Sequence, residues 1–268
     1  VFVNFGQGTV NDTLATMHST NIDVAGQNLR TAINDAELAG TTELGISASW
    51  SDGNGGLWIF GGEGYMYGSS NDVKRMNDLW KYDISTEMWT WMSGEKIWSS
   101  NQNTPLYGSW GTRGNADSTN VPSGRYRHMA WSDKKNGNLW LFGGTGFLDG
   151  GGGAVHQLND LWKYNISTGY WTWEEGEKDW SNDSNTPRFG NWGTKGVATS
   201  TNVPSGRFNG MTWTGKNVNN ASGFLWLFGG AGFLDGSGDN AQPINDLWRY
   251  DISTQEWTWM SGEKYWSN

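Results

Sequence analysis

Residues 158–165 read Leu-Asn-Asp-Leu-Trp-Lys-Tyr-Asn, and closely similar stretches stand at 76–83 and 244–251. The three copies lie 82 and then 86 residues apart. The tryptophans follow the same period, because the spacings of 9, 2 and 7 residues between Trp162 and Trp180 recur in both other copies. Self-similarity at a fixed period is typical of repeated supersecondary units that stack on one another. The sequence therefore predicts a repeat protein.

The composition favours a β protein with an aromatic core. The 268 residues include 40 glycines and 15% aromatic residues, and 17% are charged. A disordered chain would be poor in aromatic residues. Burial of a tryptophan removes roughly 150–250 Å² from water, so even partial burial of the 20 tryptophans would support a large core. The length suits one large β domain or two smaller ones.

Charge and cysteine content exclude several classes of protein. The net charge is −9 and no three Lys or Arg residues are consecutive, which argues against nucleic-acid binding. The lack of cysteine excludes disulfides, cysteine nucleophiles and thiolate zinc sites. Apolar runs such as residues 139–142 are far shorter than the ~20 residues that span a bilayer, so we expect no membrane insertion.

The middle repeat predicts four short antiparallel strands. Residues 126–131 alternate in polarity, and the Asn-Gly turn at 136–137 is a strong hairpin signal. An apolar strand at 139–142 follows, closed by Gly143 and Gly144. The segments 158–165 and 170–174 supply the last two strands, which we call c and d after a and b.

The three copies together carry a resemblance to a known family. A hydrophobic strand that ends in Gly-Gly, then a Tyr, then a Trp after six intervening residues resembles the kelch repeat, which forms one blade of a β-propeller. The matching sets are Gly61-Gly62/Tyr82/Trp89, Gly143-Gly144/Tyr164/Trp171 and Gly229-Gly230/Tyr250/Trp257. The resemblance implies an all-β radial stack of four-stranded blades, with strand a innermost and tryptophans between the blades. We expect strands to end near Gly62, Gly144 and Gly230.

The resemblance divides the chain into segments. We expect blade 1 with its linker at 41–124, blade 2 with its linker at 125–206 and blade 3 at 207–268. Residues 1–40 lack tryptophan and Gly-Gly, so they are expected to form an extension or partial blade. Three blades cannot close a ring of ordinary geometry. Either further blades follow in a longer parent protein, or two chains associate into a six-bladed ring.

Loop lengths suggest where function could lie. The b–c and d–a connections of such a blade emerge on one face, and here they are the long ones, as at 145–157 and 179–206. Long loops in compact domains are usually functional. We therefore expect a protein or glycan partner to bind this loop-rich face. Oligomer packing is the alternative role for it.

Two tryptophans of the connecting segments are candidate ligand-binding residues. Trp110 and Trp192 each stand in a glycine loop, beside Arg113 and Lys195 respectively. An indole next to a cation could stack on a sugar ring or a partner side chain. It could equally plug the connecting segment onto the blade.

Two arginines are further candidates. Arg125 and Arg207 each follow Val-Pro-Ser-Gly and begin strand a, whereas Leu44 holds this place in the first repeat. Each arginine could bind an anionic ligand or brace the blades through carbonyl groups.

Metal candidates are weak. Residues 235–240 have oxygen ligands at alternating positions, with Asp235 and Asp239 as calcium candidates, but they lack the bidentate Glu of a calcium loop. The three histidines show no metal-ligand spacing. We therefore expect no cofactor other than a weakly supported calcium ion.

These observations favour a non-catalytic binding scaffold, extracellular or on the cell surface. Proteins with kelch propellers include copper-dependent sugar oxidases and sialic-acid mutarotases. The oxidase chemistry needs a cysteine-modified tyrosine, which this chain cannot supply. A mutarotase needs acid/base residues and an arginine, for which Arg125, Arg207 and Glu177 are available. A third alternative is a structural subunit of an external layer or filament.

Overall fold

Every regular element in the described part of the chain is a β-strand. The computed structural model describes residues 48–64, 74–95, 106–148, 154–178, 189–216, 223–234 and 241–265. Within these ranges the expectation of an all-β chain built from antiparallel sheets is confirmed. Residues 1–40, predicted to be an extension or partial blade, lie outside the described residues.

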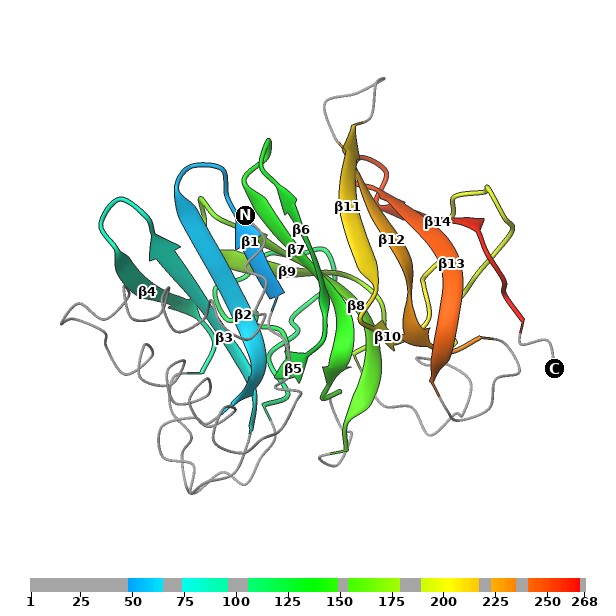
Figure 1. Cartoon of the computed structure of the whole chain (residues 1–268), viewed down its shortest axis with the longest axis horizontal. Helices are drawn as coiled ribbons and strands as arrows, with labels where there is room; N and C mark the ends of the chain where they lie inside the picture. Colours follow the sequence, from blue (N-terminus) through cyan, green and yellow to red (C-terminus); the bar gives the residue numbers. More distant parts are fainter. Residues whose placement is uncertain are drawn as a thin grey trace, which may run out of the picture.

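The strands form three antiparallel sheets, one for each repeat (Figure 1). Sheet 1 consists of β1 (Ala48–Ser51), β2 (Gly56–Gly64), β3 (Lys74–Asp83) and β4 (Met88–Ser93). Sheet 2 consists of β5 (Arg125–Tyr126), β6 (Met129–Asp133), β7 (Asn138–Gly146), β8 (His156–Asn165) and β9 (Tyr170–Glu175). Sheet 3 consists of β10 (Arg207–Phe208), β11 (Met211–Lys216), β12 (Gly223–Gly232), β13 (Gln242–Asp251) and β14 (Glu256–Ser261).

The first strand of sheets 2 and 3 is interrupted, which the sequence did not indicate. β5 and β6 both pair with β7, and β10 and β11 both pair with β12. Arg127 and Asn209 lie at the breaks with φ of 57°, in the left-handed region that non-glycine residues seldom adopt. Sheets 2 and 3 therefore each have the expected four strand positions, and two short strands fill the first position.

The strands end near the Gly-Gly pairs as expected, and the pairs themselves form bulges. β2, β7 and β12 continue two residues beyond the pair and end at Gly64, Gly146 and Gly232. In sheet 2 the pairing register shifts between Phe142 and Gly144. Gly143 has φ of 61°, and a Cβ there would lie 2.8 Å from the carbonyl oxygen of Leu158. Only glycine fits such a position, so the motif fixes the bulge.

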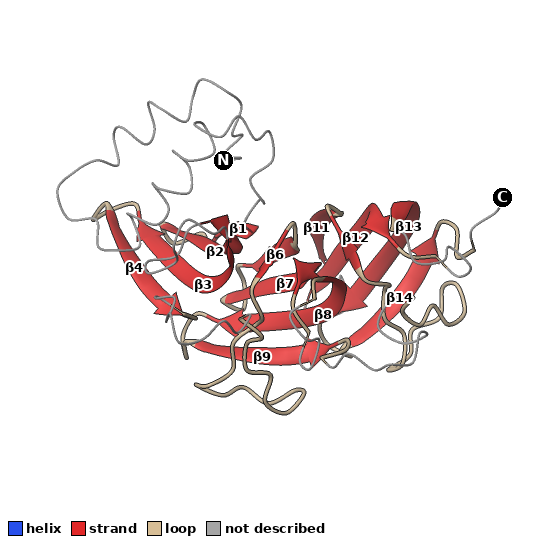
Figure 2. Ribbon diagram, turned by 90° about the horizontal axis from the view of Figure 1, so that it is seen from below, coloured by secondary structure: helices blue, strands red, loops and turns tan. Residues whose placement is uncertain are grey.

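The three sheets stand side by side in sequence order and form an arc. Figure 2 shows β4, β9 and β14 along one side of the arc, and β1, β6 and β11 along the other. β6 contacts both β1 and β11, so sheet 2 lies between the other two. This order gives two joints between sheets, each with its own buried cluster.

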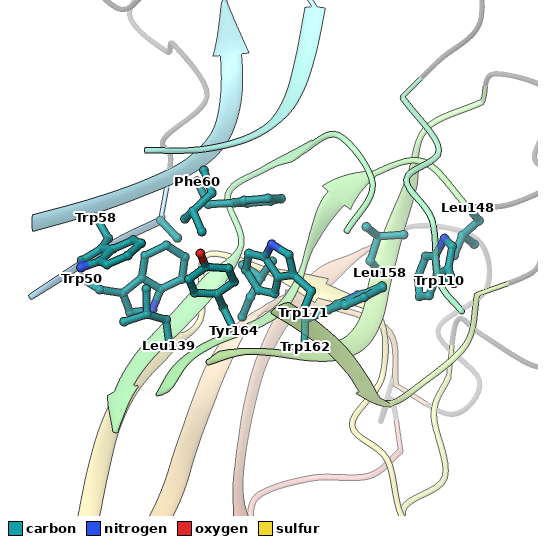
Figure 3. Close-up of a cluster of buried hydrophobic side chains, with 13 residues drawn as sticks. Trp50, Trp58, Phe60, Trp110, Leu139, Leu148, Leu158, Trp162, Tyr164 and Trp171 are labelled. Carbon is teal, nitrogen blue, oxygen red and sulfur yellow. The ribbon is translucent and has the colours of Figure 1, made fainter. Parts of the chain in front are cut away.

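The joint between sheets 1 and 2 is built from aromatic side chains (Figure 3). Trp58 and Phe60 of β2 face an aromatic pair on sheet 2. The ring centroids of Trp58 and Tyr164 are 5.7 Å apart, and those of Phe60 and Trp171 are 5.4 Å apart. Tilted and edge-on rings at such distances attract each other in addition to the apolar area that they bury. Sheet 1 therefore packs on sheet 2 through specific ring contacts.

The joint between sheets 2 and 3 repeats this arrangement. Trp140 and Tyr250 have centroids 5.7 Å apart, and Phe142 and Trp257 have centroids 5.6 Å apart. A tryptophan of the innermost strand also crosses each joint. Trp50 Nε1–H donates to the carbonyl of Trp140 at 3.1 Å, and Trp131 Nε1–H donates to that of Trp226 at 2.8 Å. The tryptophans between sheets have the packing role that the repeat predicted.

Replacing Trp171 by Ala should lower the free energy of unfolding by about 3–5 kcal/mol, because it leaves a large cavity in the joint between sheets 1 and 2. Trp89 holds the same place in sheet 1 but is only partly buried, so Trp89→Ala should cost less than half as much. Guanidinium unfolding followed by circular dichroism measures both. Equal losses would contradict the packing described above.

Candidate functional site

The described parts of the two long connections, 106–124 and 189–206, lie along the outermost strands of sheets 2 and 3. The Gly114 N–H donates to the carbonyl of Trp173 on β9 at 2.8 Å, and the Gly196 N–H donates to that of Trp259 on β14 at 2.8 Å. An outermost strand otherwise presents unpaired backbone groups that invite aggregation. The length of these connections thus has a structural purpose, beyond the binding role that the sequence suggested.

Two buried asparagines hold these connections in place, and sequence reasoning missed them. The side-chain amide of Asn120 donates to the carbonyls of Trp171 at 3.0 Å and Asn115 at 2.9 Å. Asn202 does the same with Trp257 at 3.0 Å and Val197 at 2.9 Å. The signal was available, since Thr-Asn-Val-Pro-Ser-Gly occurs at both 119–124 and 201–206. A buried amide with two bonds is a strong local anchor.

Trp110 and Trp192 are buried, with exposed fractions of 4% and 1%. The Trp110 ring lies 5.0 Å from the Trp162 ring and edge-on to Trp173, and Trp192 repeats this arrangement in sheet 3. Each indole N–H donates to a backbone carbonyl three residues earlier. Their ring faces are therefore covered, because each indole fills the space between its connection and the sheet. The partly exposed rings required for stacking on a sugar are not found.

The cations beside these tryptophans remain at the surface. Arg113 Nε–H donates to the carbonyl of Glu174 at 2.9 Å, and its guanidinium forms an ion pair with Glu175. Lys195 is exposed, with Nζ 5.5 Å from the centroid of Trp259. Both cations hold the connection to an outer strand.

Arg125 and Arg207 are fully buried in matching ion pairs. Arg125 binds Asp160 through two nitrogens at 2.7 and 2.6 Å, and its remaining hydrogens go to Ser123 and the carbonyl of Gly143. Arg207 binds Asp246 in the same way, at 2.7 Å for each contact. Their guanidinium groups have no surface for an anionic ligand. Each arginine instead braces its own sheet, because it joins the first strand position to the aspartate of the third.

Sheet 1 carries the same aspartate without that arginine. Asp78 accepts a hydrogen bond from Trp80 Nε1 at 2.6 Å, as Asp160 does from Trp162 at 2.7 Å. Leu44, at the position of the arginine in the sequence, lies outside the described residues. Burial raises the pKa of Asp78 to about 6, against the opposing effect of the Trp80 hydrogen bond. The ionised carboxylate is therefore less favourable in the folded protein than in water.

A polar group unique to the joint between sheets 2 and 3 also escaped sequence reasoning. Glu174 is buried, forms an ion pair with Lys163 and accepts a hydrogen bond from Gln255 of sheet 3 at 3.1 Å. Its counterparts are Met92 and Met260, so the departure from the repeat was the available signal. Glu174 thus distinguishes this joint from the one between sheets 1 and 2.

A buried histidine links the inner strands of sheets 1 and 2. His128 Nε2 accepts a hydrogen bond from the Ala48 N–H at 2.9 Å. Burial, followed by the charge of Arg125, holds the pKa of His128 well below its usual range. The imidazole is therefore neutral at pH 7 and acts as an acceptor between the sheets. Glu177, the candidate acid/base residue, lies at the surface beyond β9.

The outward face of sheet 3 exposes large apolar side chains. Met211, Trp213 and Phe228, here called the sheet 3 patch, have exposed fractions of 65%, 44% and 39%. The ring of Trp213 stacks on Trp226 of the neighbouring strand, with centroids 6.1 Å apart and planes 5° apart. Contiguous apolar side chains at a surface commonly mark an interaction site. The sheet 3 patch is the candidate functional site.

No group of three His, Asp or Glu side chains able to hold a metal ion occurs in the described ranges. The calcium candidates Asp235 and Asp239 lie outside these ranges. Within the same ranges, no helix has the length and hydropathy to cross a bilayer.

The comparisons with known proteins give a distant likeness among solved structures. No protein-family model and no curated protein matches the chain. A solved structure titled "Structure of YjhT" is similar over 84% of this chain, with 16% sequence identity and a TM-score of 0.45. The match covers 53% of that structure, so the chain spans about half of its length.

Trp110→Ala and Trp192→Ala should each lower the free energy of unfolding by about 3 kcal/mol, because both indoles fill cores. Trp213→Ala, at the exposed patch, should cost under about 1 kcal/mol. Chemical unfolding of the three variants is the measurement. Unchanged stability in the first two would show that their rings are free to bind a ligand.

The two aspartates should respond oppositely to neutralisation at pH 7. Asp160→Asn leaves Arg125 buried without its counter-charge, which should cost about 3–5 kcal/mol. Asp78→Asn should instead stabilise the protein by about 1 kcal/mol, because the raised pKa of Asp78 means that ionisation opposes folding. That gain should shrink as the pH falls from 7 to about 4, where Asp78 is protonated in the folded state. Unfolding curves at several pH values test both signs.

Proposed function

We propose that the three sheets are consecutive blades of a kelch-like β-propeller, and that the chain is a non-catalytic scaffold that binds a protein partner. The observation that carries this proposal is the sheet 3 patch. Its counterparts in sheet 2, Met129 and Phe142, are almost completely buried against sheet 3. The same face of sheet 3 therefore has the side chains of a sheet-to-sheet joint with solvent in place of a neighbour.

The charged residues support a binding role over catalysis. Arg125 and Arg207, two of the three candidates for a mutarotase, are fully buried and fully hydrogen-bonded. A catalytic group must come within hydrogen-bond reach of the reacting atoms. Arg113 is committed to Glu175 and to the backbone of β9. These three arginines thus act on the fold itself.

The chemistry of the patch favours a protein over a glycan. Protein interfaces concentrate methionine and aromatic residues at their centres. Specific ligand sites add convergent polar groups to such apolar surface. The sheet 3 patch consists of a thioether, a phenyl ring and an indole whose second face lies against Trp226. A glycan partner remains a second candidate because the indole of Trp213 is 44% exposed.

The test compares the wild-type chain with a Trp213→Ser/Phe228→Ser variant. Both side chains are substantially exposed, so the variant should keep its melting temperature. Binding of an apolar fluorescent dye, measured at high dilution where the patch is free of any partner, should fall several-fold. Cross-linking to partner proteins at higher concentration should fall as well, because the apolar contact area is lost. Val197→Ser, an exposed apolar residue on a connection, is the matched control and should change neither.

Other outcomes would overturn the proposal. Unchanged cross-linking in the double variant would move recognition to another surface. Saturable binding on a glycan array that is lost in the same variant would assign the patch to carbohydrate. Interconversion of sugar anomers by the purified chain, followed by NMR, would show that the protein is an enzyme.

A further inference from the structure

We propose that the partner of the sheet 3 patch is a second copy of this chain, which docks the outward face of its sheet 1 there. This inference rests on the proposed function and names its partner. Two copies joined head to tail at both ends would form a closed ring of six sheets. The two joints already present within the chain supply the template for this contact.

The outward face of sheet 3 is equivalent to surfaces of sheets 1 and 2 that are already buried. Trp226 and Phe228 hold the places of Trp58 and Phe60 in sheet 1, which pack on sheet 2. Trp213 holds the place of Trp131, whose indole N–H crosses to the next sheet. The outward face of sheet 3 thus carries the same side chains that pack against the next sheet at each existing joint.

The outward face of sheet 1 carries the side chains that receive such a contact at the existing joints. Tyr82 and Trp89 form a ring pair with centroids 5.2 Å apart and planes 48° apart. The pair that receives sheet 1 on sheet 2, Tyr164 and Trp171, has values of 5.1 Å and 55°. The receiving pair on sheet 1 is therefore already arranged for docking, which lowers the entropic cost of association.

The turn between β3 and β4 also exposes apolar side chains on the outward face of sheet 1. Ile84 and Met88 are 53% and 55% exposed. The counterparts of Ile84, which are Ile166 and Ile252, pack against the buried clusters of the two joints. Ile84 is the residue that a docked sheet 3 would cover. One chain therefore carries both complementary faces, at opposite ends of its arc (Figure 2).

Superposing the existing joints on the new one gives its contacts. Trp226 would meet Tyr82 of the second copy, as Trp140 meets Tyr250. Phe228 would meet Trp89 of the second copy, as Phe142 meets Trp257. Trp213, now stacked on Trp226, would turn so that its N–H reaches the carbonyl of Trp58 in the second copy, as Trp131 reaches Trp226.

The charges at this joint are complementary. In the joint between sheets 2 and 3, Gln255 of one sheet reaches the Glu174–Lys163 pair of the other. At the new joint Arg249 stands in the place of Lys163, and Glu87 of the second copy stands in the place of Gln255. Glu87 shares with Gln255 the left-handed conformation of this turn, with φ of 56° and 59°. Opposite charges would therefore face each other across the contact.

A contact between two different faces is heterologous, and it closes only when the rotation between units is right. Six sheets lie within the usual range of four to eight for propeller rings. Closure with two copies uses the new joint twice and leaves neither outward aromatic face in water. Two-fold symmetry then relates the halves of the ring.

The first measurement is the molar mass of the full chain by light scattering during size-exclusion chromatography. The expected mass is twice 29.7 kDa. Phe228→Ser and Ile84→Asp alter exposed residues on opposite faces, so each alone should weaken association tenfold or more while the circular dichroism spectrum of the folded chain is kept. A mixture of the two variants should form a heterodimer, because one intact joint remains between them. Val197→Ser is again the control and should stay dimeric.

Charge reversal gives a second, independent readout. Arg249→Glu and Glu87→Arg should each weaken association, and the two changes combined in one chain should restore it. Restoration requires that these residues face each other across the joint, which a purely structural role within one sheet would not produce.

Three results would overturn the inference. A monomer whose patch still binds the apolar dye would reject self-pairing and leave the proposed scaffold function standing. A monomer with a protected patch would assign the patch to another segment of the same chain, and would reject both proposals. Polymers of undefined length, or a dimer that neither single variant weakens, would reject the closed head-to-tail ring.

Discussion

The structure depends on one repeated contact, in which two aromatic rings of one sheet meet a Tyr–Trp pair of the next. Trp58 and Phe60 make this contact at the first joint, and Trp140 and Phe142 make it at the second. A single sheet is one layer and cannot enclose a core of its own. Its apolar faces are buried only when another sheet packs on them. Stability is therefore held between units, as in other repeat proteins. The innermost tryptophans add a hydrogen bond that fixes how far the sheets are staggered.

Other features that recur between repeats serve this stacking by stiffening the sheets. Arg125 with Asp160 ties the first ladder position of sheet 2 to the third, and the Gly-Gly bulge lets the chain turn beside them. The connection from the previous repeat then covers the outer strand and inserts Trp110 against it. A rigid sheet with a protected edge presents two flat aromatic faces, and those faces define how the molecule can meet a neighbour.

The candidate site follows from the same logic, since a stacking surface without a neighbour is a binding surface. Sequence reasoning placed recognition on long connections with Trp110 and Trp192, because glycine loops with an indole and a cation resemble ligand platforms. The sequence does not tell whether an indole in such a loop turns outward or inward, and here packing on Trp162 and Trp248 turns both inward. The exposed Trp213 and Phe228 instead stand on β11 and β12, at positions that hold the same residue in every repeat.

The sequence by itself determined the local features: strands, turns, the bulged Gly-Gly pairs and the three-fold period, because these depend on residue types at short spacing. It also indicated that most tryptophans would be structural. The tertiary structure alone decided which copies of a repeated residue are buried. Met129 and Met211 hold the same place in two repeats, yet one has a neighbouring sheet and the other faces solvent. Burial depends on which units stand next to each other in space, and a repeating sequence carries the same local pattern in both positions.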